Sequence, residues 1–423
     1  MTPVPLSPPL APAEAAQLAR LIFAQAERRK LDADVRARIA ARAGALRLER
    51  IRPYFGSLAR DPVHHSSYYM AVDGDTGSPQ LLHVAPASAP TSSVFPTPLL
   101  VGRSHPEGGP EIVVNSVPFS PGDHRNISKF VSAVDTAFLP KPGKARSEIR
   151  AAAPAAFAAF QTIWKTRGKN LAALGLAGDS APAPFYYAAL WGAIRSGWRE
   201  GYSVGVTLRV SRPEDIEAAR ERIRAASRFT RFAIDVGAVT AAAEAPSGAA
   251  TFPAGAFARP FDTGETVFEF SPADLARLAA RFGPALGMAE RLHETIQARA
   301  TGPGSRAFDF EFSLASSPAP TQPAELLFCL EWLKCAGRPA HLAAPALSAE
   351  LARQPEQLRS LAAVARLYHC TLSIDTHGDD RPETLEAVAR VTAGRYHFEA
   401  PRMPETTPDY AAYIAELARG LAG

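Results

Sequence analysis

Short apolar runs of strand length alternate with helical patterns from about residue 110 onward, and no other feature constrains the fold as strongly. This alternation is typical of βαβ units, whose strands are parallel and covered by helices. Eight runs fit the description: EIVVNSVPF (111–119), NLAALGLAG (170–178), YSVGVTLRV (202–210), RFAIDVG (231–237), AFDFEFS (307–313), AHLAAP (340–345), CTLSID (370–375) and RYHFEAP (395–401).

The number of these units selects among the parallel α/β folds. Eight β/α units spread over some 310 residues predict a (β/α)8 TIM-like barrel, with an open doubly wound sheet as the alternative. The helices are expected to begin where Ser, Thr or Asp stands near a Pro with an acid in the first turn, as in SRPED, SPAD, TQPAE, DRPE and TPD. These residues cap free N–H groups, fit the first turn and meet the positive end of the helix dipole.

The chain is expected to form two parts. Residues 1–105 predict a small α+β extension made of an N-terminal helix and a strand unit, and residues 106–423 predict the barrel. A segment at about 238–270, rich in Ala, Gly, Pro and Phe, interrupts the pattern after the fourth strand. We interpret it as an insertion in a β→α loop, which is expected on the catalytic face of a barrel.

The charge balance argues against a nucleic-acid partner. The 423 residues carry 46 basic and 42 acidic side chains, and the densest basic run, ERRK (27–30), has no interleaved aromatic residues. A solvated helix face explains that run better. No apolar run approaches the roughly 18 to 20 residues of a membrane-spanning helix. We therefore expect no membrane partner either.

Cysteine usage points to a reducing compartment. Cys329, Cys335 and Cys370 form no CxxC pair. Their odd number and wide spacing argue against a disulfide framework and against a structural zinc site. The first residues lack the basic head and apolar core of a signal peptide. A cytoplasmic location is the resulting expectation.

Alternation of side chains divides each strand into an apolar and a polar face. In a barrel the apolar face meets the helices and the polar face looks into the lumen, where an isolated charge is costly unless it is paired or bound to metal. The charged residues expected to converge there are Asp235, Asp309, Glu311, Asp375, Glu399, Arg209, Arg395 and His397. Two interpretations remain open: a ligand or metal site, or Arg–carboxylate pairs that fill the lumen as a satisfied network.

The stretch HCTLSIDTHGDD (369–380) raises the same question at one strand end, because four titratable side chains follow the apolar run within six residues. It is either a strand end that presents a metal or acid/base site, or a loop that caps the next helix. Asp380 fits a cap for a helix beginning at Pro382. Asp375 and His377 remain candidates for the site.

Several blocks of the sequence resemble the tagaturonate epimerase family, metal-dependent enzymes that interconvert tagaturonate and fructuronate. The resemblance begins at VNSVPFSPGDHRNISKFVSAVDTAFLPKP (114–142) and covers roughly 110 to 400, with the blocks in the family's order. The N-terminal hundred residues match poorly. The further blocks are TRGKNLA, ALWGAIRSGWREGYS, RPFDTGETVFEFSPADLARLAARFGPALGMAERLHETI, FDFEFSLASSPAPTQPAELLFCLEWLKCAGRPAHLAAPAL and LAAVARLYHCTLSI.

The resemblance implies a particular chemistry. Inverting C4 of a 2-keto sugar acid cannot proceed by simple enolisation, because C4 is not adjacent to the ketone. A retro-aldol route would break the C3–C4 bond and re-form it on the other face. That route needs a base for the C4 hydroxyl and a divalent cation, for which zinc, manganese and nickel are candidates. The implied partner is a small sugar acid.

The chain also departs from the family, because the family's polar strand-end motifs are largely replaced. The corresponding segments read RSEIR, GLAGDSAP, VGVTLRV and DTHGDD. The resemblance implies that Asp235 keeps the acid of the fourth strand and that Asp309 and Glu311 keep the pattern of the fifth. Two alternatives to the epimerase therefore stay open. One is a catalytically degenerate paralogue that binds a sugar acid or a partner protein without turnover, and the other is an aldolase or isomerase acting on a different sugar.

The hypothesised roles divide the polar residues into three groups. The acid/base group is Asp309 or Glu311. The substrate group is Arg209 or Arg395 for the substrate carboxylate, together with His397. The metal ligands are Asp235, Asp375, His377 and Glu399. The oligomeric state is left open, and a homo-oligomer is compatible with the sequence.

Overall fold

A computed structural model describes most of the predicted elements. It covers residues 11–17, 51–61, 66–75, 79–89, 99–105, 108–118, 146–149, 157, 160, 172–176, 181–196, 198, 201–241, 253–300, 308–347, 355–375, 382–393 and 395–399. By its internal contacts the chain divides into two compact units. These are Met1–Asp135 with Leu190–Glu200, and Thr136–Ala189 with Gly201–Gly423.

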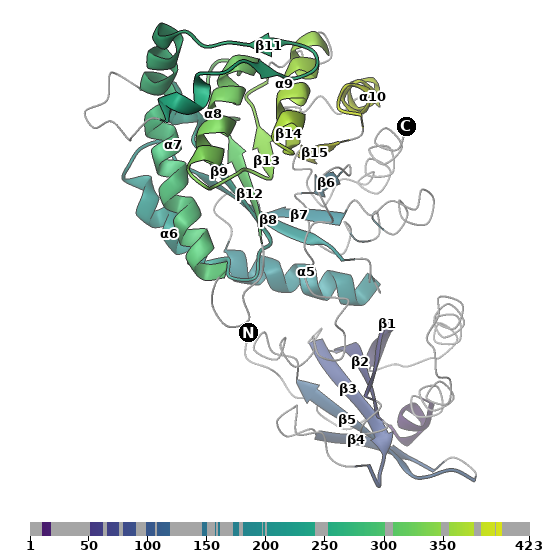
Figure 1. Ribbon diagram of the computed structural model, residues 1–423. Helices are drawn as coiled ribbons and strands as arrows, with labels where there is room; N and C mark the ends of the chain where they lie inside the picture. The colour runs from purple at the N-terminus through teal and green to yellow at the C-terminus, as the bar shows by residue number, and fades with distance from the viewer. Residues whose placement is uncertain are drawn as a thin grey trace. The chain divides into compact units, whose positions relative to one another are not determined.

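The first unit contains an antiparallel sheet of five strands in the order β1-β2-β3-β5-β4 (Figure 1). The strands are β1 (Ile51–Asp61), β2 (Ser66–Asp73), β3 (Pro79–Pro86), β4 (Leu99–Ser104) and β5 (Ile112–Pro118). The expectation that 111–119 is the first barrel strand was wrong, because β5 pairs antiparallel with both β3 and β4. An apolar run of this length predicts a buried strand but does not say which sheet the strand joins.

The second unit contains eight parallel strands that pair in a closed ring, β12-β13-β14-β15-β6-β7-β8-β9. Seven of the eight predicted runs supply strands of the ring, and the eighth strand is β6, which lies in the RSEIR segment. The strands are β6 (Arg146–Ile149), β7 (Ala172–Leu176), β8 (Ser203–Arg209), β9 (Arg231–Asp235), β12 (Asp309–Ser313), β13 (Leu342–Ala344), β14 (Thr371–Asp375) and β15 (Tyr396–Glu399).

Helices connect the successive strands from β7 to β15. They are α5 (Pro182–Ser196), α6 (Asp215–Ala225), α7 (Pro272–Ala300), α8 (Pro323–Cys335), α9 (Pro355–Leu367) and α10 (Pro382–Val391). The predicted parallel α/β architecture is confirmed. The complete eightfold (β/α)8 pattern stays a prediction, because much of the chain after β6 and all of it after β15 lie outside the described residues.

The predicted helix starts are correct for the segments containing SPAD and TQPAE, although the capping residue differs in the second. At the start of α7, Ser271 Oγ accepts a hydrogen bond from Asp274 N at 3.1 Å and donates to Asp274 Oδ2 at 2.7 Å. At the start of α8 the N-cap residue is Gln322, whose N–H donates to Glu325 Oε2 at 2.9 Å. The Thr321 hydroxyl instead accepts from Ala346 N at 2.9 Å and ties the loop before α8 to the loop after β13.

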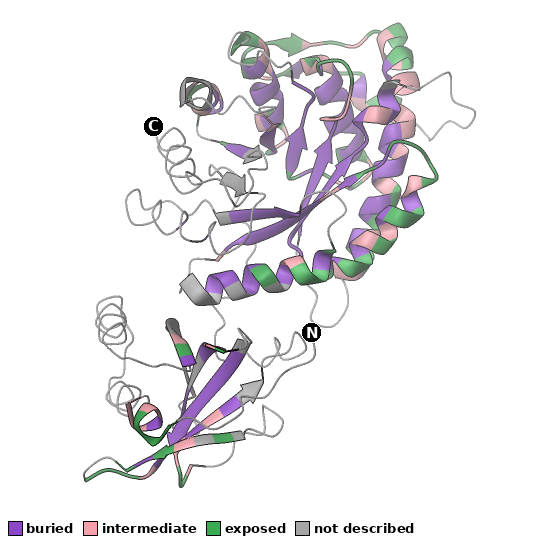
Figure 2. Cartoon of the chain, turned by 180° about the vertical axis from the view of Figure 1, so that it is seen from behind, coloured by how far each residue is buried: buried purple, intermediate pink, exposed green. Residues whose placement is uncertain are grey.

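The apolar face of the strands packs against helix α7. Phe310 of β12 lies 4.9 Å from the ring of His293 of α7, and the Arg299 guanidinium lies 4.7 Å from the ring of Phe232 of β9. Phe232 and Phe310 are completely buried, as is most of the ring in Figure 2. This face supplies the hydrophobic core between sheet and helices. The opposite face of the same strands carries Arg231, Asp309 and Glu311.

The predicted insertion contains the short helices η3 (Gly237–Ala241) and η4 (Ala254–Phe257) and the hairpin β10 (Phe261–Asp262) and β11 (Val267–Phe268). We call its described second half, 253–270, the strap. Its described side chains contact the outer helices: Phe257 stacks on Phe328 of α8 with ring centroids 5.1 Å apart, and Glu265 pairs with Arg366 of α9 at 3.1 Å. The expected position of this half on the catalytic face was therefore wrong.

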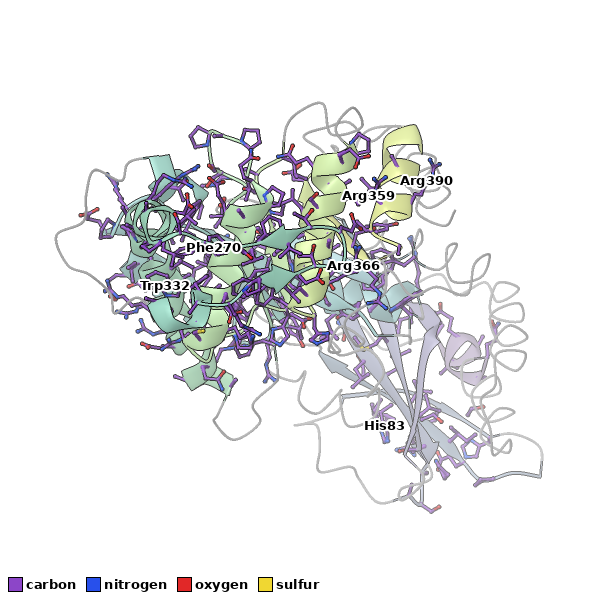
Figure 3. The ribbon with its side chains drawn as sticks, turned by 45° about the horizontal axis from the view of Figure 1, so that its top comes forward. His83, Phe270, Trp332, Arg359, Arg366 and Arg390 are labelled. Atoms are coloured by element: carbon purple, nitrogen blue, oxygen red, sulfur yellow. The ribbon has the colours of Figure 1, made fainter. Side chains whose placement is uncertain are left out.

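Helix α8 is buried on both of its sides, and the strap covers one of them. All residues from Leu326 to Leu333 are buried, Glu331 included, because the ring of strands covers one side of the helix and the strap covers the other. Phe270, labelled in Figure 3, extends this aromatic layer. Its ring centroid lies 5.6 Å from that of Phe257. Among the helices of the described ranges, none has the length and hydrophobicity that crossing a lipid bilayer requires.

Replacing Phe257 by Ala tests the strap. The side chain is 2% exposed, so its removal leaves a cavity over α8 and should lower the free energy of unfolding by about 3–5 kcal/mol. The matched control is Val267→Ala in the same strap, where the side chain is 56% exposed, and the expected change is within about 0.5 kcal/mol. Denaturant unfolding followed by tryptophan fluorescence measures both. Equal effects of the two substitutions would contradict the packing described.

His293 makes stability depend on pH. Burial lowers its pKa to about 4 from 6.5, and the nearby positive charge of Arg338 acts in the same direction. Below about pH 6.5 the unfolded chain binds a proton that the folded chain refuses, so stability falls as the pH drops from about 6.5 toward 4. His293→Leu should flatten this part of the stability profile, whereas the same loss at the exposed His369 (His369→Asn) should not. A profile unchanged by His293→Leu would contradict the burial.

Candidate functional site

Three carboxylate positions lie in line at the C-terminal ends of neighbouring strands. Asp375 of β14 pairs in register with Glu399 of β15, and Glu399 pairs in register with Glu148 of β6. Residues that pair directly across neighbouring strands lie on the same face of a sheet. We call these three positions the carboxylate row. In parallel α/β barrels this end of the strands carries the active site.

The layer directly below the row is also polar. Ser373, His397 and Arg146 occupy successive register positions on β14, β15 and β6. Ser373 and His397 are buried, with 1% and 0% exposure. The Ser373 hydroxyl makes no hydrogen bond to any residue in the described part of the chain. Buried hydroxyls in proteins are normally hydrogen-bonded, so Ser373 is a candidate donor in the layer below the row.

β7 pairs directly with β6, so β7 and β8 lie next to the row, where they bring little side-chain volume to the same face. The register places Ala173 and Gly175 of β7 beside Ser203 and Gly205 of β8. A Cβ atom at Gly205 would lie 2.5 Å from Nε of Arg231, so any larger residue there would displace the guanidinium. The Arg231 side chain therefore lies across Gly205 inside the ring.

Arg231 forms an ion pair with Glu311, and both side chains are almost completely buried at 0% and 1% exposure. Glu311 was one of the two predicted acid/base residues, but its Oε2 accepts a hydrogen bond from Arg231 in the interior of the ring. This contact matches the alternative interpretation of the lumen as a satisfied Arg–carboxylate network. Cys370 lies near this pair, and burial together with the negative charge of Glu311 raises the pKa of its thiol, which keeps it unreactive.

Two predicted residues lie at the wrong end of their strands. Asp309 is the first residue of β12, and its backbone N–H donates to Thr230 O just before β9 begins. Arg395 precedes β15, and its side chain is exposed. Both positions are at the N-terminal ends of the parallel strands, opposite the carboxylate row. Face alternation along a strand predicted which side these residues take but not which end of the ring they reach.

Asp235 ends β9 at the mouth of the ring and is 2% exposed. Its Oδ1 accepts hydrogen bonds from Ser316 Oγ at 2.8 Å, Ser316 N at 3.2 Å and Gly237 N at 3.2 Å. Its Oδ2 lies 3.5 Å from Nε of Arg209. Oδ1 is thus engaged by three protein donors and Oδ2 faces Arg209, contacts that favour a structural role over the predicted role as a metal ligand.

Arg209 ends β8, so it reaches the same mouth, and its side chain is 72% exposed. Of the two arginines predicted to bind a substrate carboxylate, it is the one placed at the strands' C-terminal ends. A guanidinium can hold a carboxylate through two parallel hydrogen bonds. Its partner Asp235 is buried beneath it and holds it from one side only.

Of the other predicted metal ligands, Asp375 is half-buried in the carboxylate row and Glu399 holds the neighbouring register position. His377 lies outside the described residues. Within the described ranges no group of three or more His, Cys, Asp or Glu side chains is arranged to hold a metal ion. The metal site therefore stays a prediction.

The sequence interpretation missed Glu148 and Ser373 and assigned no role to Arg231. Alternation places Ser373 and Arg231 on the polar faces of their strands but does not say how far along the strand each one lies. Glu148 lies in RSEIR, four polar residues around a single Ile, which is too short and too charged to predict a buried strand. Only its register with β15 brings it into the row.

The described residues define a parallel α/β barrel-type fold with polar residues at the C-terminal ends of its strands. No protein-family model matches the sequence, and no curated protein matches it. Solved structures do match. The fructuronate-tagaturonate epimerase UxaE from Cohnella laeviribosi complexed with one glycerol is 18% identical with a TM-score of 0.61, covering 87% of this chain and 75% of that one. Its native structure gives 19% identity and a TM-score of 0.59 over the same shares. At this identity the likeness shows the fold.

Removing one charge of the buried pair separates the structural from the catalytic role of Glu311. Glu311→Gln removes the negative charge that faces the buried guanidinium of Arg231, which should lower the free energy of unfolding by about 3–5 kcal/mol. The double variant Arg231→Met/Glu311→Leu removes both charges at similar volume and should recover most of that loss. Chemical denaturation measures both variants. A Glu311→Gln variant that is as stable as the parent chain but has lost turnover would return the acid/base role to Glu311.

Proposed function

We propose that this chain is a divergent member of the tagaturonate/fructuronate epimerase family and that it epimerises a keto-sugar acid at the mouth of a complete (β/α)8 barrel. The observation that carries the proposal is the fold shared with a fructuronate-tagaturonate epimerase over 87% of the chain. The carboxylate row and Arg209 lie at the strand ends where that fold class places its chemistry. The proposed substrate is a small sugar acid such as tagaturonate or fructuronate.

The residues at the row suit a divalent cation in their chemistry. Carboxylate oxygens are ligands that manganese, zinc and nickel accept, and the buried Ser373 hydroxyl below the row lacks a partner in the described ranges. Asp375 and Glu399 would hold the cation, with His377 as a further donor, and Glu148 is then the carboxylate of the row left for proton transfer. When bound, the cation would supply positive charge next to the substrate's ketone and hydroxyl oxygens. Asp235 does not belong to this set.

The protein's own residues account for binding and proton transfer. Arg209 binds the substrate carboxylate and fixes the sugar at the mouth of the ring. A carboxylate of the row takes the proton from the C4 hydroxyl. The C3–C4 bond then breaks, its electrons pass toward the ketone, and the resulting aldehyde turns before the bond re-forms on its other face. The same carboxylate returns the proton, so no atoms or electrons are gained or lost.

A second candidate function has an observation in its favour. The buried pair of Arg231 and Glu311 fills part of the lumen, and Asp235 is engaged by loop contacts. Both contacts fit a paralogue that keeps the scaffold and binds a sugar acid or a partner protein without turnover. Metal content and activity measured on the same preparation distinguish the two functions.

The test is interconversion of tagaturonate and fructuronate by the purified chain, followed by NMR, with elemental analysis of the same sample. We expect turnover that chelation abolishes and that added manganese, zinc or nickel restores. Asp375→Asn should weaken metal binding and lower kcat by at least about 10-fold to 100-fold. The control, Asp262→Asn, removes an exposed carboxylate from the strap and should leave kcat unchanged. A metal-free preparation that binds the uronates without converting them would overturn the epimerase and support the paralogue.

A further inference from the structure

We propose that Asp235 is a positioning residue with two separate tasks: one oxygen locks together the two loops that follow β9 and β12, and the other holds Arg209 toward the carboxylate of a sugar acid. This inference rests on the proposed function and adds Ser316 and Gly237 to the site. Asp235, Arg209 and Ser313 are the last residues of three neighbouring strands, so this corner belongs to the mouth of the ring.

The first task belongs to Oδ1 of Asp235. It accepts hydrogen bonds from Ser316 Oγ at 2.8 Å and from the backbone N–H of Ser316 and Gly237, each at 3.2 Å. Ser316 lies in the loop between β12 and α8, whereas Gly237 begins η3 after β9. One buried oxygen therefore holds two loops that are about 80 residues apart in sequence.

We call this contact between the loops after β9 and β12 the joint. Ser316 contributes a further hydrogen bond to it. Its Oγ accepts the Ala238 N–H at 2.9 Å, so the same hydroxyl both donates to Asp235 and receives from η3. The hydroxyls of Thr240 and Ser317 lie 3.3 Å apart and add a second link between the two loops. Each loop thus contributes both backbone and side-chain groups to the contact.

Gly237 shows how closely the loops approach. A Cβ atom at this position would lie 2.4 Å from Ser317 N and 2.5 Å from Leu314 O. Both are backbone atoms, which cannot move aside as a flexible side chain would. Only glycine therefore fits at this position, because the backbones of the two loops are in direct contact here.

The second task belongs to Oδ2, which lies 3.5 Å from Nε of Arg209. Asp235 is 2% exposed and Arg209 is 72% exposed, so the carboxylate anchors the base of the guanidinium and leaves its outer edge open to solvent. A guanidinium held in this way presents donors to an incoming carboxylate with less loss of side-chain freedom. The structure thus assigns to Arg209 and Asp235 together the selection of a charged sugar acid over the uncharged sugar.

Asp235→Asn separates the two tasks. The amide oxygen can still accept the three hydrogen bonds at Oδ1, whereas the amide nitrogen replaces the charge that faces Arg209. We expect binding of D-galacturonate, measured by calorimetry on the full chain, to weaken by about threefold to tenfold. KM for the uronate substrate should rise in the same proportion while kcat changes less. Binding of D-galactose, which lacks the carboxylate, should not change.

Ser316→Ala tests the joint without touching the ion pair. Hydrogen exchange in peptides covering 236–241 and 314–321 should become faster, because both loops lose contacts that the hydroxyl provides. In Asp235→Asn the same peptides should keep their protection. The control is Asp215→Asn, which removes a carboxylate from the exposed pair with Arg212 and should alter neither uronate binding nor exchange in these loops.

Three outcomes would overturn the proposal. Asp235→Asn that binds galacturonate as tightly as the parent chain would show that Arg209 does not depend on Asp235. Asp235→Asn that loses bound metal would make Asp235 a metal ligand. Unchanged exchange in Ser316→Ala would remove the joint. A parent chain that lacks epimerase activity but shows the expected differences in binding and exchange would instead refute the proposed function alone.

Discussion

Closure of the parallel strands into a ring is the constraint on which the rest of the structure depends. Each strand turns one face to the helices and the other to the lumen, and closure shields the interior of the lumen from water. Charge carried on that side must be paired. Arg231 and Glu311 meet this demand in the interior, where Gly205 leaves room for the guanidinium. The same closure gathers the last residues of separate strands at one mouth.

The position of a polar residue along its strand, in the interior of the ring or at its mouth, then determines what the residue does. Residues in the interior are neutralised by one another, as in the pair of Arg231 and Glu311. At the mouth, the charged groups are reached from one side by solvent: Arg209 is largely exposed, and Asp375 is half-buried. Asp235 lies between the interior and the mouth: its own side chain is buried, but it contacts the exposed side chain of Arg209. Structural and functional polar residues therefore share one face of the sheet and differ in level.

Much of this fold could be predicted from the sequence, because hydrophobic periodicity reports burial directly. Seven of the eight apolar runs became ring strands, and the alternation in FDFEFS placed the phenylalanines toward α7. The same signal failed for β5, which is equally apolar but pairs antiparallel in the first unit. It also failed for β6, because this short strand is mostly polar and shows no hydrophobic periodicity. Only its pairing with β15 and β7 identifies it as a strand.

The candidate site could be predicted only in part. Residue type and alternation selected Asp235, Asp375 and Arg209, which do lie at the mouth. Alternation repeats every two residues, however, and carries no information about how far along the strand a residue lies. Asp309 and Arg395 were placed on the site for that reason, although both lie at the opposite strand ends. Glu148 enters the row through register with Glu399, a property of strand pairing and not of local sequence. The role of Asp235 depends on a loop 81 residues away.

The central claim is that the carboxylate row and Arg209 together form one ligand site at the mouth of the ring. A crystal structure of the chain soaked with manganese and a sugar acid tests it most directly, because anomalous scattering identifies the position of the ion. The account predicts an ion at Asp375 and Glu399 and a ligand carboxylate on Arg209. A ligand bound elsewhere, or row carboxylates paired with arginines and lacking an ion, would contradict it.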